Sequence, residues 1–203
     1  MNFWRQEDGN MIKIGILALQ GSCIEHFNIL SKIDGVTPFY VKTVKELDNI
    51  DGLIIPGGES TVISKLLKDF DMFNYLKEKI KKGLFCYGTC AGVILLAKEI
   101  KGEACHLGLM DITVFRNAYG RQLGSFETEL DVLEVSDKKI KGVFIRAPKI
   151  IRCGIDVKIL CKYKDSPVMA RQNNILVTTF HPELTDNLAV HKYFVKMIKD
   201  SFI

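Results

Sequence analysis

The first hundred residues alternate between short apolar runs and segments of helical periodicity, and this alternation restricts the fold more than any other feature. The apolar runs predict buried strands at 11–19, 37–42, 52–56 and 84–87. The segments between them predict helices over 24–33, from about residue 60, over 71–83 and from about residue 92. Asp71 is a suitable N-cap and Gly83 a suitable stop for the third helix. Such alternation predicts a parallel sheet with helices on both faces.

The second half of the chain is rich in strand candidates with little helix between them. These candidates cover residues 111–116, 125–135, 142–147, 156–163, 167–172 and 174–180. They predict an extension of the sheet and a small antiparallel portion. The last segment, 187–202, has helical spacing and should pack back on the core. We therefore predict one α/β domain over 11–203, with a flavodoxin-like three-layer fold, preceded by a flexible extension over 1–10.

Composition restricts the classes of function. The net charge of the 203-residue chain is +4 and its lysines are scattered, which argues against a nucleic-acid-binding face. No uncharged apolar run approaches the roughly 18 to 20 residues that span a bilayer, and residues 1–10 do not form a signal peptide. We therefore expect a cytoplasmic protein that does not contact membranes and whose six cysteines are reduced. No Cys-x-x-Cys pair occurs, and neither a metal site nor a cofactor is expected.

Cys90 is flanked symmetrically by glycines in Gly88-Thr89-Cys90-Ala91-Gly92, between a predicted strand and a predicted helix. A residue at a sharp strand-to-helix turn has a strained backbone, and the glycines relieve crowding there, as in the G-x-S-x-G nucleophile elbow. The N-terminus of the following helix is expected to favour a thiolate. We therefore predict that Cys90 is a nucleophile. The other cysteines are interpreted as buried core residues: Cys23, Cys86, Cys105, Cys153 and Cys161.

A thiolate nucleophile needs a proton shuttle, and His181 is the candidate. It follows the predicted strand 174–180, and active-site residues in parallel sheets gather at the carboxyl ends of strands. Pro182 is expected to keep the segment extended, so that His181 and Glu183 face the same side. Glu183 can then orient the imidazole, which completes a predicted triad of Cys90, His181 and Glu183. The other histidines (His26, His106 and His191) are assigned to helices or a loop.

A third predicted strand end carries the sequence PGGES at 56–60. Its two glycines permit backbone N–H groups to turn into a pocket. A simple tight turn with Ser60 as N-cap gives the same pattern, and so does a phosphate-binding loop. A phosphate-transfer site would also need a lysine and a metal-binding acid, which the motif lacks.

Six motifs together resemble those of one enzyme family: LALQG (17–21), PGGEST (56–61), GTCAG (88–92), RNAYGRQ (116–122), FIRAP (144–148) and FHPEL (180–184). The chain is similar to class I glutamine amidotransferases with a Cys-His-Glu triad. Within that class it resembles the glutaminase subunits of pyridoxal 5'-phosphate synthase. The RNAYGRQ and FIRAP segments are what narrow the resemblance to this vitamin B6 branch, and the similarity extends from residue 11 to about residue 195.

The resemblance implies a reaction and a set of binding residues. Cys90 would attack the side-chain amide of L-glutamine, His181 would take and return the proton, and glutamate and ammonia would be released. The implied oxyanion hole consists of backbone N–H groups of Gly58 and Ala91. The implied glutamine-binding residues are Gly58, Glu59, Ser60, Arg116, Ile145 and Arg146. Without the resemblance, surface ion pairs would be the preferred interpretation of the two arginines.

The resemblance also implies a partner. In the family, ammonia passes to a synthase subunit, a (β/α)8 barrel of a ring-shaped core, which makes pyridoxal 5'-phosphate. Gln20 matches a family position near the oxyanion hole that responds to docking of this subunit. We expect the free chain to hydrolyse glutamine feebly and to be activated by the partner.

Two alternatives compete with this interpretation. A glutaminase that serves an amino-acid or nucleotide synthase would lack RNAYGRQ and carry a bulkier pair at Ala91-Gly92. A non-catalytic thiol sensor of the same architecture would use Cys90 for redox chemistry, and it would not need His181 and Glu183 beyond a strand end.

Overall fold

The computed structural model describes residues 11–116 and 124–202. The predicted N-terminal extension lies outside the described residues, and so does the RNAYGRQ motif after Arg116.

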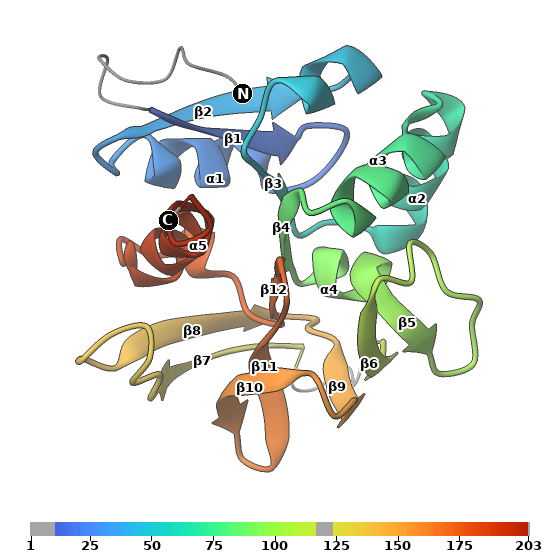
Figure 1. Cartoon of the computed structure of the whole chain (residues 1–203). Coiled ribbons are helices and arrows are strands. Elements are labelled where there is room, and N and C mark those ends of the chain that lie inside the picture. Colours follow the sequence, from blue (N-terminus) through green and yellow to red (C-terminus); the bar gives the residue numbers. More distant parts are fainter. Residues whose placement is uncertain (1–10, 117–123, 203) are drawn as a thin grey trace.

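A seven-stranded sheet in the order β10-β11-β12-β4-β3-β1-β2 forms the centre of the described part of the molecule (Figure 1). Its strands are β1 (Ile12–Leu17), β2 (Val36–Val41), β3 (Gly52–Ile55), β4 (Phe85–Thr89), β10 (Lys158–Tyr163), β11 (Ser166–Gln172) and β12 (Ile175–Thr178). The five strands from β12 to β2 pair in parallel, whereas β10 and β11 are antiparallel to their neighbours. The predicted sheet, mainly parallel with an antiparallel portion, is confirmed.

Helices cover both faces of this sheet, which confirms the three-layer prediction (Figure 1). One face carries α1 (Cys23–Leu30) and α5 (Ala189–Lys199). The other carries α2 (Ser60–Asp69), α3 (Met72–Lys81) and α4 (Ala91–Leu96). Two short 3₁₀ turns, η1 (Val44–Asp48) and η2 (Pro182–Leu184), lie in the connections.

Two small sheets flank the end of the central sheet that β10 occupies (Figure 1). One contains β5 (Ala97–Ile100), β6 (Met110–Phe115) and β9 (Lys149–Cys153), and the other is a hairpin of β7 (Ser125–Leu130) and β8 (Ile140–Ile145). The sequence did not predict β5 or β9. Both become strands by pairing with β6, and β5 follows α4 without a glycine or proline to mark the change. The predicted strand 125–135 is too long, since β7 ends at Leu130.

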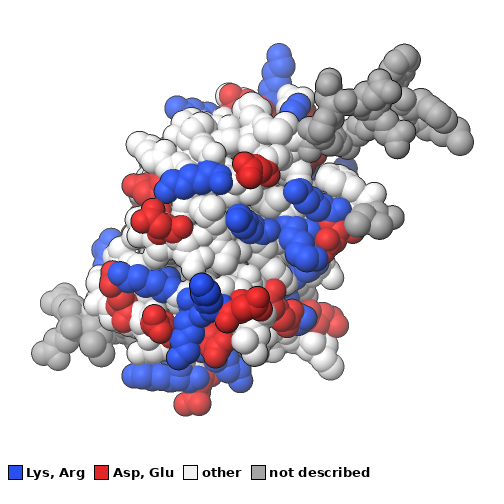
Figure 2. Space-filling model, turned by 90° about the vertical axis from the view of Figure 1, so that its left-hand side faces the viewer, with Lys and Arg blue, Asp and Glu red and all other residues white. Residues whose placement is uncertain are grey.

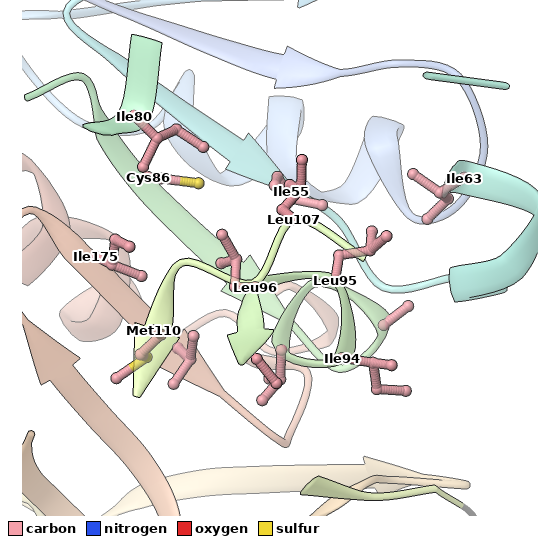
Figure 3. Close-up of a cluster of buried hydrophobic side chains, with 14 of the residues drawn as sticks. Ile55, Ile63, Ile80, Cys86, Ile94, Leu95, Leu96, Leu107, Met110 and Ile175 are labelled. Atoms are coloured by element: carbon pink, nitrogen blue, oxygen red, sulfur yellow. The ribbon is translucent and has the colours of Figure 1, made fainter. Parts of the chain in front are cut away.

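The sheet separates two hydrophobic cores. Figure 3 shows the core beneath α2, α3 and α4, where Ile55, Ile63 and Leu95 are fully buried. The second core lies beneath α1 and α5 and contains Ile14, Tyr87 and Phe194. Strands between two such layers are buried on both sides, which is why every residue of β3 and β12 is buried and burial does not alternate along them.

Some local predictions hold and others do not. Gly83 follows the end of α3 with a φ of +108°, as a helix stop does. Asp71 does occupy the N-cap position of α3, but its backbone is left-handed and its side chain makes no capping hydrogen bond.

The cysteine prediction is right only in part. Cys86 and Cys161 are buried as expected, and burial raises the pKa of the Cys161 thiol to about 11. Cys105 is exposed, so its assignment to the core is wrong. It lies in the loop between β5 and β6, and loops run over the surface where no apolar layer covers them. Cys23 and Cys153 are half-buried.

On the face shown in Figure 2, lysines and arginines are interspersed with aspartates and glutamates. Opposite charges therefore neighbour one another on this face. None of the helices in the described part of the chain is both long and apolar enough to cross a membrane.

The two glycines around Cys90 have a packing role that the structure defines. A Cβ on Gly92 would lie 2.4 Å from the carbonyl oxygen of Ile55 in β3, and a Cβ on Gly88 would lie 2.8 Å from the carbonyl carbon of Gly92. Both distances are shorter than non-bonded atoms tolerate. Helix α4 thus starts directly against β3 and β4, and only residues without a side chain fit between them.

We predict that Gly92→Ala lowers the free energy of unfolding by about 1–3 kcal/mol, because the added methyl group overpacks the contact with Ile55. Chemical denaturation of the variant and the unmodified chain measures this difference. Gly35→Asn is the control, since Gly35 has open space around it and asparagine tolerates its left-handed backbone. Equal stability of Gly92→Ala and the unmodified chain would contradict the packing role.

Candidate active site

Cys90 lies at the turn between β4 and α4, with φ +47° and ψ −98°. A positive φ is unfavourable for a residue with a side chain and costs about 1–3 kcal/mol, so the predicted backbone strain at the elbow is present. The side chain is nearly buried, and its sulfur lies 3.8 Å from the carbonyl oxygen of Ile145. The turn thus directs the thiol towards the end of β8.

His181 reaches the same edge of the sheet because β12 pairs in parallel with β4. Thr178, the last residue of β12, is aligned with Thr89, and the backbone N–H of Cys90 donates to the carbonyl of Thr178 at 2.9 Å. The expectation of an extended segment at Pro182 is wrong. This proline opens the 3₁₀ turn η2, whose first position suits the fixed φ of proline.

The turn still brings His181 and Glu183 together. Nδ1 of His181 lies 2.7 Å from Oε1 of Glu183, and because an ionised carboxylate only accepts, Nδ1 carries the proton. Nε2 of the neutral ring therefore remains free to accept a proton. Ser22 Oγ, at the start of α1, donates a second hydrogen bond of 2.8 Å to the same carboxylate oxygen.

Electrostatics stabilise the charged imidazole that forms when His181 takes a proton at Nε2. Burial alone would lower the pKa of His181, but its interactions with Cys90 and Glu183 raise that pKa to about 10. Burial alone would raise the pKa of Glu183, but His26 and the hydrogen bond with His181 hold it at about 2. A Cβ added to Gly57 would approach both the His181 ring and Cβ of Cys90, so the two side chains lie close together beside this glycine. Contacts within the predicted triad therefore oppose the effect of burial on both pKa values.

A cavity of about 100 Å³ opens beside Cys90. Its lining contains every residue that the resemblance implies for glutamine binding or the oxyanion hole, together with Ile94: Gly58, Glu59, Ser60, Cys90, Ala91, Ile94, Arg116, Ile145 and Arg146. These residues come from four separate stretches of the chain. Their convergence on one cavity is independent of the motif comparison that singled them out.

Polar groups of the cavity have distinct environments. Ser60 is buried, and its hydroxyl has no hydrogen-bond partner among the described residues. Arg116 donates to Glu59 at 2.7 Å and to Glu103 at 2.8 Å. The arginine therefore does form ion pairs, as the alternative interpretation had it, but it forms them at the cavity and not on a remote surface.

The loop after β1 packs against the PGGES turn. Oε1 of Gln20 accepts a hydrogen bond of 2.8 Å from the backbone N–H of Glu59. The backbone N–H of Ser22 donates to the carbonyl of Gly57 at 3.0 Å. Gln20 therefore contacts the segment that contains Gly58, although it does not line the cavity.

Sequence reasoning missed four residues near the site. Ile94 lines the cavity, and Glu103 holds Arg116. Ser22 and His26 both approach Glu183, from more than 150 positions away in the sequence. Ile94 follows Cys90 by four positions on α4, a helical spacing that could have placed it beside the thiol. No local pattern could have revealed the other three, because their contacts depend on how α1 and the β5–β6 loop pack. In the described parts of the chain, no group of His, Cys, Asp and Glu is arranged to hold a metal ion.

The acid dependence of stability tests the environment of Glu183. Its pKa is depressed in the folded chain from an ordinary value of 4.5 to about 2, so its contribution to stability is present above pH 4.5 and is lost as the pH falls towards 2. We predict that the difference in Tm between the unmodified chain and Glu183→Gln shrinks over this interval. Thermal unfolding monitored by circular dichroism measures it.

Glu129→Gln, on the exposed side of β7, reports the background effect of removing a carboxylate. A Tm difference for Glu183→Gln that is the same at pH 3 as at pH 7 would contradict the assigned environment.

Comparison with known proteins gives consistent results. The sequence matches the SNO glutamine amidotransferase family over residues 16–200. It is 51% identical to pyridoxal 5'-phosphate synthase subunit PdxT of Ruminiclostridium cellulolyticum, over 93% of this chain and 100% of that protein. It is 52% identical to the subunit of the same name from Clostridium botulinum, over 94% of this chain and 100% of that protein.

A solved structure described as a glutamine amidotransferase superimposes with a TM-score of 0.86 at 41% identity, covering 92% of this chain and 98% of the other. The resemblance stated from the motifs is thereby confirmed. The chain belongs to the SNO glutamine amidotransferase family, in the branch formed by the pyridoxal 5'-phosphate synthase subunits.

Proposed function

We propose that this chain hydrolyses L-glutamine to L-glutamate and ammonia and delivers the ammonia to a pyridoxal 5'-phosphate synthase subunit. The observation that carries the proposal is the cavity beside Cys90, which is lined by the residues expected to bind glutamine and to form the oxyanion hole. His181 is close enough to Cys90 for the thiol to raise the pKa of its imidazole. Membership of the family supports the same reaction.

The two alternative functions explain fewer features of the site and of the sequence. A non-catalytic thiol sensor has no need of a histidine that lies close to the thiol and is itself oriented by a buried carboxylate. Glutaminases of other synthases are disfavoured by relatives at 51% and 52% identity that are pyridoxal 5'-phosphate synthase subunits.

The proposed reaction has two stages. His181 takes the proton of the Cys90 thiol, and the sulfur attacks the side-chain amide carbon of glutamine. His181 then returns the proton to the amide nitrogen, the C–N bond breaks, and ammonia leaves a glutamyl thioester. Water, deprotonated by His181, attacks the thioester, so that glutamate is released and the thiol is restored. Glu183 holds Nδ1 throughout and stabilises the charged ring.

The negative charge that develops on the amide oxygen during the attack must be stabilised by hydrogen-bond donors. We assign this role to the backbone N–H groups of Ala91 and Gly58, which both border the cavity. Ala91 is the first residue of α4, where backbone N–H groups have no partner within the helix. A donor of this kind contributes about 3–4 kcal/mol to transition-state stabilisation.

The remaining cavity residues suit the rest of glutamine. A guanidinium group binds a carboxylate with two parallel hydrogen bonds, so Arg116 and Arg146 are assigned to the α-carboxylate. The unpartnered hydroxyl of Ser60 and the carboxylate of Glu59 offer polar contacts to the substrate, and Ile145 offers its backbone and an apolar side chain. The proposal includes a cytoplasmic location, because the nucleophile must stay a reduced thiol.

The partner is assigned to the rim of the cavity. Three exposed apolar side chains lie on the elements that build the site: Ile24 on α1, Ile145 on β8 and Leu184 on η2. We propose that the synthase subunit, a (β/α)8 barrel of a ring-shaped core, covers this rim. Gln20 lies next to it and is bonded to the N–H of Glu59, so docking there can adjust the neighbouring Gly58.

We predict that Cys90→Ala abolishes pyridoxal 5'-phosphate formation from glutamine when the chain is mixed with its synthase subunit, and leaves formation from added ammonium salts intact. The variant lacks the nucleophile but still permits the partner's chemistry. The product is measured by its absorbance. Cys105→Ala is the matched control, because that thiol is exposed and does not line the cavity. Glutamine-dependent formation at the unmodified rate in Cys90→Ala would refute the nucleophile assignment.

Glutamate release by the free chain and by the mixture tests the role of Gln20. We expect the synthase subunit to raise the rate at least ~10-fold by completing the oxyanion hole, since one donor is worth about 10²–10³ in kcat. Gln20→Ala should reduce this activation, because the bond to Glu59 is lost. Comparable turnover with and without the partner would contradict docking control.

A further inference from the structure

Two histidines that the proposed reaction does not use are completely buried beside the triad. His26 lies on α1 and His191 on α5, two helices on the same face of the sheet (Figure 1). Both side chains have no exposed surface, and Nδ1 of His26 lies 3.0 Å from Nε2 of His191. Buried polar groups are costly unless they are hydrogen-bonded, so this pair needs an explanation.

Their surroundings favour the neutral form of both rings near pH 7. Burial is the largest cause that lowers the pKa of each, and it takes that of His191 to about 3. A neutral imidazole has one N–H donor and one bare nitrogen. One proton therefore lies between the two rings, and the ring that carries it determines whether Nε2 of His26 is protonated or bare.

The surroundings favour one of the two arrangements. If His26 Nδ1 donated, the N–H of His191 would be at Nδ1, which is buried and has no partner among the described residues. The other nitrogen of His26, Nε2, would then point a lone pair at the carboxylate of Glu183, 3.5 Å away. If His191 Nε2 donates instead, only a bare nitrogen is left unpartnered, and Nε2 of His26 carries a proton. The second arrangement avoids both the unpartnered buried N–H and the lone pair that faces the carboxylate.

The proton on Nε2 of His26 faces the edge of the sheet where the predicted triad lies. Nε2 of His26 lies 3.2 Å from the hydroxyl oxygen of Thr89, the residue before Cys90, and 3.5 Å from Oε1 of Glu183. The same carboxylate oxygen accepts from Ser22 and contacts His181. Helix α1 thus directs two donors at the oxygen that orients the histidine.

We propose that His26, held in one tautomer by His191, is a positioning residue that directs its Nε2–H at Glu183 and Thr89 and so fixes the carboxylate against His181. The inference rests on the proposed function of the triad, and it adds a chain of buried rings that links α5 and α1 to the reaction. The titratable and charged groups that face His26 are His181, which precedes η2, Glu183 of η2, His191 of α5, Tyr87 of β4, and Glu25 of α1.

Two substitutions of His26 separate positioning from packing. Asparagine can reproduce the contact of Nδ1 with His191 but has no group at the place of Nε2, whereas glutamine can place an N–H there. We expect His26→Asn to lower kcat for glutamate release at least ~10-fold with KM changed less than about twofold, because misplaced catalytic groups cost this much or more. The acid limb of its pH–kcat profile should move to higher pH, and His26→Gln should recover most of the loss.

The experiment uses the full chain with its synthase subunit, over pH 5–9, with Tm measured for every variant. Equal losses in both variants, or an unmodified kcat and pH profile in His26→Asn, would overturn the positioning role. Cys90→Ala separates this inference from the proposed function. If the unmodified chain releases no more glutamate than Cys90→Ala, the proposed function fails, whatever the His26 variants do.

A measurement on the unmodified chain keeps the inference testable if the variants do not fold. Nitrogen-15 NMR of the histidine side chains distinguishes the two tautomers. We expect two mutually hydrogen-bonded histidines, each with a proton on Nε2 and none on Nδ1, unchanged between pH 7 and 8. A proton on Nδ1 of His26 would overturn the proposal.

Discussion

The parallel pairing of β4 with β3 on one side and β12 on the other is the constraint on which the site depends. It brings the ends of these strands to one edge of the sheet, where Ile55 is aligned with Gly88 and Thr178 with Thr89. The PGGES turn, the Cys90 elbow and the His181 turn follow at these ends. Gly92 then permits α4 to start against the Ile55 carbonyl, and a larger residue would move the elbow away.

Because the residues at this edge of the sheet are buried, their contacts determine which of them carry a charge. Glu183 is buried, and a carboxylate there would be neutral if nothing compensated for the lost water. His181, Ser22 and His26 surround one of its oxygens and keep the charged form. Burial disfavours the charged form of Glu183, but the low-dielectric surroundings also strengthen its hydrogen bond with His181.

Much of the fold was predictable because its residues carry local patterns. The continuous apolar runs of β1, β3 and β4 and the helical stripes of α1, α3 and α5 repeat over enough residues to be read without neighbours. Strand β5 and strand β9 were not predictable, since they form by pairing with β6. The same limit applies to Cys105, whose exposure depends on the course of a loop, and to Pro182, which suits a 3₁₀ turn as well as an extended segment.

Some features of the site were likewise predictable from the sequence and others were not. Local patterns of residues predicted the glycine-flanked elbow, the succession of strand ends and the pairing of His181 with Glu183, because these features lie within a few adjacent residues. Packing of the folded chain brings Ser22, His26 and His191 together behind Glu183 and places Glu103 against Arg116. These contacts join segments that are far apart in the chain. Their existence depends on how helices pack on a completed sheet, which no local pattern of residues encodes.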